Sequence, residues 1–191
     1  MLITINEVFG IAAVTLVVGF IISGYIQRPK NPVEMLYRKP SFIDWEDMKF
    51  AMIVSGPAII LHELGHKFMG MLLGLPAAFH ALWSGLAIGV VLRMIGSPFL
   101  VLAPAYVSFP SATASNLQMM LIAFAGPFVN LVLWLSSAAY IKYHKGRMSR
   151  TKVMVLLLTK RLNMILFIFN MIPIPPIDGF SIFSNLYYML V

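Results

Sequence analysis

The chain has 191 residues, 60% of them hydrophobic, and its mean hydropathy is +0.87. Soluble domains do not carry this much apolar surface, so the composition predicts a polytopic membrane protein of a single domain's length. The absence of cysteine excludes disulfides and thiolate metal ligands, and the net charge of +7 indicates orientation in a membrane rather than nucleic-acid binding.

Four stretches are apolar and long enough to cross a bilayer, which takes about 20 helical residues. They are 8–26, 50–74, 119–141 and 153–172. The first could be read as a signal peptide, but it lacks a basic region before it and a clear cleavage site of small residues. Residues 27–49 form a polar loop, with a surface helix expected near Trp45. We therefore expect an all-α polytopic membrane protein with about four transmembrane helices.

Residues 75–118 do not fit a regular span. They are largely apolar but contain Arg93 and several glycines, followed by Pro98, Pro104 and Pro110. Backbone broken by glycine and proline at membrane depth usually lines a cavity and is covered by protein. We favour a re-entrant or irregular segment between the second and third spans, and the alternative is a short helix over 79–95.

Charged residues are rare within the apolar segments. Of the seven acids, only Glu63 and Asp178 have apolar surroundings in the sequence, whereas the other five lie at the N-terminal edge or in the first loop: Glu7, Glu34, Asp44, Glu46 and Asp47. Because an ionisable group at membrane depth is energetically costly, Glu63 and Asp178 are candidates for function.

The second span contains the stretch "IILHELGHKF" at 59–68. Residues four apart share one face of a helix, so His62 and His66 can reach one tetrahedral ion, and zinc accepts nitrogen and oxygen ligands. Glu63 points away from the ligand position and can act on water, which is the H-E-x-x-H arrangement of metal hydrolases. Satisfied core histidines are the ordinary alternative, but packing does not explain this trio in so apolar a run.

A zinc site of this kind needs a third protein ligand and one open position. Asp178 is the first candidate, because it is the only acid in a setting comparable to that of Glu63. His80 and His144 are the next two candidates. Three prolines at 173–176 forbid a regular helix before Asp178, so we expect it on an extended or broken element.

Three motifs together resemble the site-2 protease family of intramembrane zinc metalloproteases: "HELGH" at 62–66, "AGPFVN" at 125–130 and "FNMIPIPPIDG" at 169–179. The resemblance implies that zinc (Zn²⁺) is held by His62, His66 and Asp178. It further implies that Glu63 is the general base and acid.

The same resemblance implies two roles for asparagines. Asn170 would place the substrate backbone or stabilise the oxyanion, and Asn130 is a weaker candidate for substrate binding or local hydrogen bonding. The resemblance also divides the chain into an N-terminal span with a basic loop, 1–49, and a metalloprotease core, 50–191. The segment 75–118 matches the family only loosely.

The expected function is zinc-dependent endopeptidase activity on peptide bonds in or near transmembrane helices of membrane proteins. The expected partners are a substrate helix and the lipid bilayer, without nucleic acid, and the expected location is the cell membrane. A helical substrate must unwind first, and we hypothesise that it pairs with a strand edge in 75–118. The alternatives are a non-proteolytic subunit of a larger membrane complex and a metal transporter.

The basic residues also predict an orientation, since Lys and Arg favour the cytoplasmic side. They concentrate in 27–49 and 142–161, which lie on the same side if each span crosses once. This rule places the region 75–118 outside, whereas the family resemblance implies the reverse.

Overall fold

The computed structural model describes residues 3–37, 42–98, 103–110, 114–144 and 146–191. In this part of the chain, four helices are long and apolar enough to cross a membrane: α1 (Ile5–Ile22), α3 (Trp45–Leu72), α5 (Asn116–Tyr143) and α6 (Arg150–Asn170). Each overlaps one of the four predicted spans, with ends that differ by two to five residues. The predicted class, an all-α polytopic membrane protein, is therefore confirmed.

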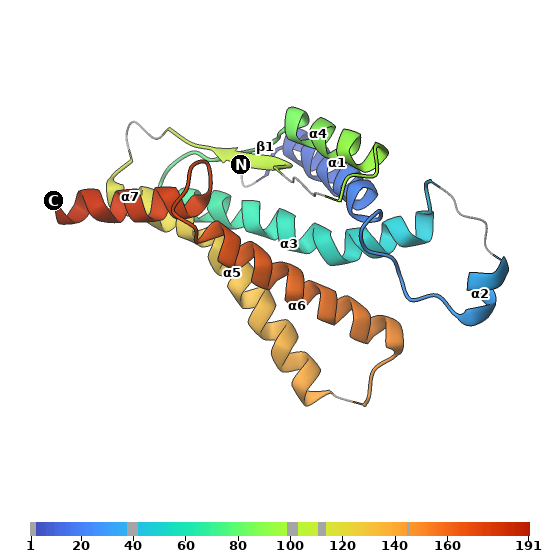
Figure 1. Cartoon of the computed structure of the whole chain (residues 1–191). Coiled ribbons are helices and arrows are strands. Elements are labelled where there is room, and N and C mark those ends of the chain that lie inside the picture. The colour runs from blue at the N-terminus through green and yellow to red at the C-terminus, as the bar shows by residue number, and fades with distance from the viewer. Residues whose placement is uncertain (1–2, 38–41, 99–102, 111–113, 145) are drawn as a thin grey trace.

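Helix α3 lies at the centre of the molecule (Figure 1). It contacts α1 and both strands, and it also packs against α5 and α6, which form a hairpin. The short helix α2 (Pro32–Tyr37) lies at one end of the molecule, and α7 (Asp178–Leu190) lies at the other. The residues of α3 thus lie next to three other helices and both strands.

Polar side chains at the N-caps explain where the spans begin. Thr4 and Ser115 each accept a hydrogen bond from the backbone N–H three residues later, and the side chains of Glu7 and Gln118 accept one from the backbone N–H of the cap residue. Such capping boxes satisfy backbone N–H groups that a helix start would leave unpaired. Asp44 caps α3 by accepting hydrogen bonds from the backbone of Glu46 and Asp47, so Trp45 begins the long helix and the separate surface helix expected there does not form.

In the described part of 75–118, two short strands lie on either side of a helix, and α5 begins at Asn116. Strand β1 (Ala78–Ala81) pairs antiparallel with β2 (Ala105–Ser108), with Ala78 opposite Ser108. The intervening α4 (Trp83–Met94) has 12 residues, about 18 Å of helix, which is too short for a bilayer core of about 30 Å. The helix that we weighed for 79–95 therefore exists in shorter form, and it is too short to cross a bilayer by itself.

The C-terminal part differs from the expectation in one respect. The prolines at 173–176 do interrupt the helix after α6, but Asp178 is then the first residue of α7 rather than part of an extended element. An acidic side chain in the first turn is favourable, because it faces the partial positive charge of the helix N-terminus. Prolines end a helix, but they do not prevent a new helix from starting directly after them.

The apolar core lies between α1, α3 and the strands. Val14, Val18 and Ile22 of α1 meet Ala51 and Ile59 of α3, and Phe79 of β1 and Leu86 of α4 complete the cluster. Burying this surface holds the strands against the helix that carries His62 and His66, and it holds α4 against α1.

Candidate metal centre

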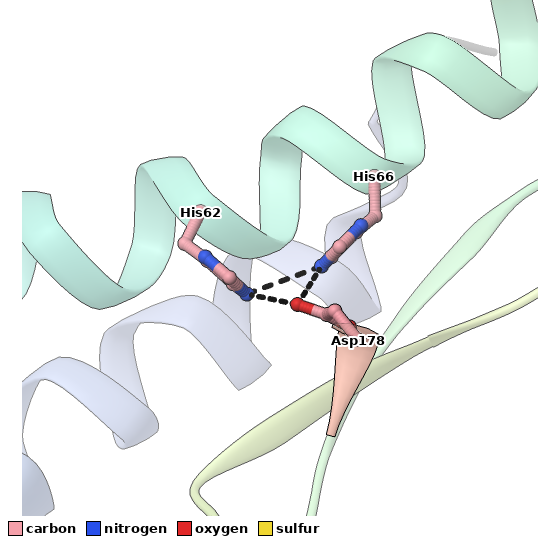
Figure 2. Close-up of side chains that lie close together, drawn as sticks. All are labelled: His62, His66 and Asp178. Atoms are coloured by element: carbon pink, nitrogen blue, oxygen red, sulfur yellow. Dashed lines mark hydrogen bonds and ion pairs between the residues drawn. The ribbon is translucent and has the colours of Figure 1, made fainter. Parts of the chain in front are cut away.

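Three side chains from two elements converge on one point. His62 and His66 lie one turn apart on α3, and Asp178 reaches them from the start of α7 (Figure 2). The Nε2 atoms of the two histidines are 3.1 Å apart, and Asp178 Oδ2 lies 3.2 Å from His62 Nε2 and 3.4 Å from His66 Nε2. Both histidines are buried. The structure thus brings together the three residues that the sequence proposes as metal ligands.

Nε2 of each histidine faces the cluster. The hydrogen bond that Nδ1 makes on the far side of the ring determines whether Nε2 carries a proton or a lone pair. His66 Nδ1 lies 2.7 Å from the backbone oxygen of Ile122, which can only accept, so Nδ1 carries the proton. His62 Nδ1 lies 2.7 Å from Asn130 Oδ1, which also accepts. In the neutral rings both Nε2 atoms therefore present lone pairs to each other and to Asp178.

This convergence fits a metal cation. Two nitrogen lone pairs and a carboxylate oxygen repel each other unless a positive charge lies between them, and Asp178 Oδ2 is buried with no hydrogen bond within the described residues. In a tetrahedral zinc site with bonds of about 2.0–2.1 Å, the ligand atoms are about 3.3 Å apart. The three distances here, 3.1, 3.2 and 3.4 Å, match that spacing. The donors are nitrogen and oxygen, which suits zinc.

Glycines leave the space that the cluster occupies. A Cβ atom on Gly126 of α5 would collide with the His66 ring and approach His62 Cε1 within 2.8 Å. A Cβ atom on Gly65 would lie 2.9 Å from the backbone oxygen of Ala125, so α3 and α5 pack closely there. Next to Asp178, a Cβ atom on Gly179 would collide with the 171–172 backbone. The motifs around these glycines therefore make room for the histidines and for the start of α7.

A cavity of about 380 Å³ opens beside the cluster. Glu63, half-buried on α3, and Asn170, the last residue of α6, both line it, as do the three candidate ligands. Part of the lining comes from β2 and the residues next to it, including Tyr106 and Val107. The proposed base and ligands therefore face one shared space.

The two other histidines lie elsewhere. His80 is on β1, where its Nε2 lies 2.8 Å from Ser108 Oγ and its ring stacks on Tyr106. His144 ends α5 and stacks on Tyr140. Neither belongs to the cluster of possible metal ligands found among the described residues.

The family resemblance implied a substrate contact for Asn130, whereas its hydrogen-bond partners in the structure are other residues of the protein. Its side chain is fully buried behind His62, where Oδ1 faces His62 Nδ1 and Nδ2 donates to Ala58 O and to Asn163 Oδ1, both at 2.9 Å. All of its polar atoms thus face the protein. This placement corresponds to the local hydrogen bonding that was the second role considered for it.

Two further polar groups were missed by the sequence argument. Asn163 is fully buried on α6, and Glu7 and Lys67 form a buried ion pair between α1 and α3. Glu7 also accepts a hydrogen bond from the backbone of Phe79 in β1 at 2.7 Å. For Asn163 and Lys67 the available signal was an amide and a lysine within predicted spans, where polar groups need partners. Glu7 lies at the edge of the first apolar run, so this signal was missing for it.

Comparisons with known proteins agree with the chemistry of the site at a coarse level. The chain is 28% identical over 130 residues, 68% of its own length, to a Methanocaldococcus jannaschii protein named "Putative zinc metalloprotease MJ0611". The match spans 66% of that relative, just under two thirds of its length. No family model and no solved structure matches the chain.

The distant relative, the four apolar helices and the His-His-Asp cluster together fit a metalloprotease of membranes in general.

Proposed function

We propose that the chain is an intramembrane zinc-dependent endopeptidase of the site-2 protease type. One observation carries the proposal: the His62, His66 and Asp178 donors and the Glu63 carboxylate border a single cavity among helices apolar enough to span a membrane. The motifs quoted above add support. The proposed setting is a multi-pass protein of the cell membrane, with a membrane-protein helix as substrate.

Five residues that line the cavity have a role in this proposal. Zinc, when held by His62, His66 and Asp178, polarises a peptide carbonyl and acidifies water. Glu63 takes a proton from water and then delivers it to the nitrogen of the leaving amine. The side-chain N–H of Asn170 donates to the substrate backbone or to the developing oxyanion.

The strands suit a substrate that must unwind. In a helix, each carbonyl is engaged by the N–H four residues later, so a scissile bond is accessible only after local unwinding. Within the described residues β2 pairs on one edge only, with β1, and Ala105, Tyr106 and Val107 line the cavity. An extended substrate segment that pairs with the second edge of β2 would have its backbone N–H and C=O groups satisfied.

The experiment compares Glu63→Gln with the unsubstituted protein. Glutamine is nearly isosteric but cannot act as a base, so Glu63→Gln should retain zinc and lose hydrolysis. Glu46→Gln is the matched control, since Glu46 lies on the same helix but is exposed and paired with Lys49. Membrane peptides from cells with each version are compared by mass spectrometry, and zinc is measured in the purified proteins.

The proposal would be supported by peptides that appear in cells with the unsubstituted protein and with Glu46→Gln but are absent from cells with Glu63→Gln. Cleavage that persists in purified Glu63→Gln would refute the proposed mechanism. Zinc-loaded protein with identical peptides in all three strains would point instead to the non-proteolytic subunit.

A further inference from the structure

Helix α6 contains a polar residue that the proposed mechanism does not use. Along α6, all of whose residues are described, Asn163 is the only buried one, and its side chain is fully inaccessible. An amide in an apolar span carries a burial cost unless it is hydrogen-bonded. The position of its partners therefore indicates what the residue does.

Asn163 belongs to a chain of hydrogen bonds that ends at His62. Its Nδ2 donates to the backbone oxygen of Thr159 at 2.8 Å, which leaves Oδ1 to accept from Asn130 Nδ2 at 2.9 Å. The other N–H of Asn130 donates to the Ala58 backbone oxygen at 2.9 Å. Both N–H groups of Asn130 are thus occupied, and its Oδ1 must face His62 Nδ1, 2.7 Å away.

The direction of these bonds matters for the metal site. Backbone oxygens only accept, so Thr159 O and Ala58 O set the orientation of the two amides. With Asn130 Oδ1 as acceptor, His62 carries its proton on Nδ1 and keeps the lone pair of Nε2 for the cluster. An Asn130 amide turned over would donate to Nδ1 and place the His62 proton on Nε2, where it blocks a metal.

We propose that Asn163 is a positioning residue for metal binding: it holds Asn130, and through Asn130 it keeps His62 in the tautomer that binds zinc. The inference rests on the proposed zinc site. Helix α6 then serves the site twice, once through Asn163 and once through the segment that leads from its C-terminal end to Asp178. Outer hydrogen bonds of this kind typically change metal affinity by about 10–100-fold.

The test measures zinc affinity of the purified full chain by competition with a chelator, together with the visible spectrum of the Co²⁺-substituted protein. Asn163→Leu removes the acceptor at similar volume and should weaken zinc binding by about tenfold. Asn163→Asp keeps an acceptor for Asn130 and should retain most of the affinity. Asn185→Leu is the matched control, because Asn185 Nδ2 donates to the backbone four residues earlier, at Ser181 O, just as Asn163 does.

A purely structural role would lower the thermal stability of Asn163→Leu but leave its zinc affinity and Co²⁺ spectrum unchanged, and that result would overturn the inference. Equal losses in Asn163→Asp and Asn163→Leu would overturn it as well. If Asn163→Leu does not fold, nitrogen NMR of His62 in the metal-free, unsubstituted chain decides: a proton on Nδ1 supports the inference and a proton on Nε2 refutes it.

The outcomes also separate this inference from the proposed function. If the unsubstituted chain binds no zinc, the proposed function fails and the inference fails with it. If it binds zinc and Asn163→Leu binds equally well, only the role of Asn163 fails.

Discussion

The buried ion pair between Glu7 and Lys67 allows a prediction about stability. The side chains are 6% and 2% exposed, and Lys67 follows directly after His66 on α3. Removing one partner of a buried pair leaves the other charge uncompensated, which costs about 3–5 kcal/mol. We therefore expect Glu7→Gln, which leaves the Lys67 ammonium buried without a countercharge, to lower the free energy of unfolding by about 3 kcal/mol or more.

The remaining contacts of Glu7 predict that Glu7→Gln and Lys67→Met lower the free energy of unfolding by different amounts. In Lys67→Met, the Glu7 carboxylate still accepts from the backbone of Phe79 and from both the backbone and the hydroxyl of Thr4. Hydrogen bonds to a charged acceptor stabilise it by about 1.5–3 kcal/mol each, so Lys67→Met should be the milder change. The double variant Glu7→Gln/Lys67→Met leaves no buried charge and should be more stable than Glu7→Gln alone.

The assay is unfolding of the metal-free variants in detergent, by heat or denaturant. Glu46→Gln is the control, because Glu46 and Lys49 form an exposed pair on the same helix, and exposed pairs contribute about 0–1 kcal/mol. The reasoning is refuted if Glu7→Gln is no more destabilising than Glu46→Gln. It is also refuted if the double variant loses as much as the two single variants added together.

Three further outcomes follow from the site and the loops. Gly126→Ala should abolish zinc binding, because its Cβ atom would collide with the ring of His66, whereas Gly56→Ala, whose Cβ atom would meet only a methyl group at 3.5 Å, should bind normally. Asp178→Ala should lower the zinc content measured by mass spectrometry; unchanged zinc would remove Asp178 from the ligand set. For orientation, the chain has no cysteine of its own, so one placed at the exposed Tyr143 reports its side of the membrane. Counting Lys and Arg predicts that an impermeant maleimide labels it only after cells are opened, and labelling of intact cells would support the family orientation.

The local features of this protein could be predicted because each depends on a few neighbouring residues. An apolar run of about 20 residues crosses a bilayer as a helix whatever surrounds it. Two histidines four apart share a helix face because of the helical repeat, so His62 and His66 could be paired without knowing the fold. Asp178 could be chosen because an acid among apolar residues is rare and costly at membrane depth.

The partners that complete the site depend on how the helices are rotated and packed against each other. His62 meets Asn130, which is 68 positions away, and Asn130 meets Asn163, 33 positions further on. Glu7 and Lys67 are 60 positions apart, and the pairing of β1 with β2 closes across α4. Local periodicity says which residues share a face, but it does not say which helix that face will meet. For that reason the metal ligands could be proposed from the sequence, whereas their hydrogen-bonded supports were determined only by the tertiary structure.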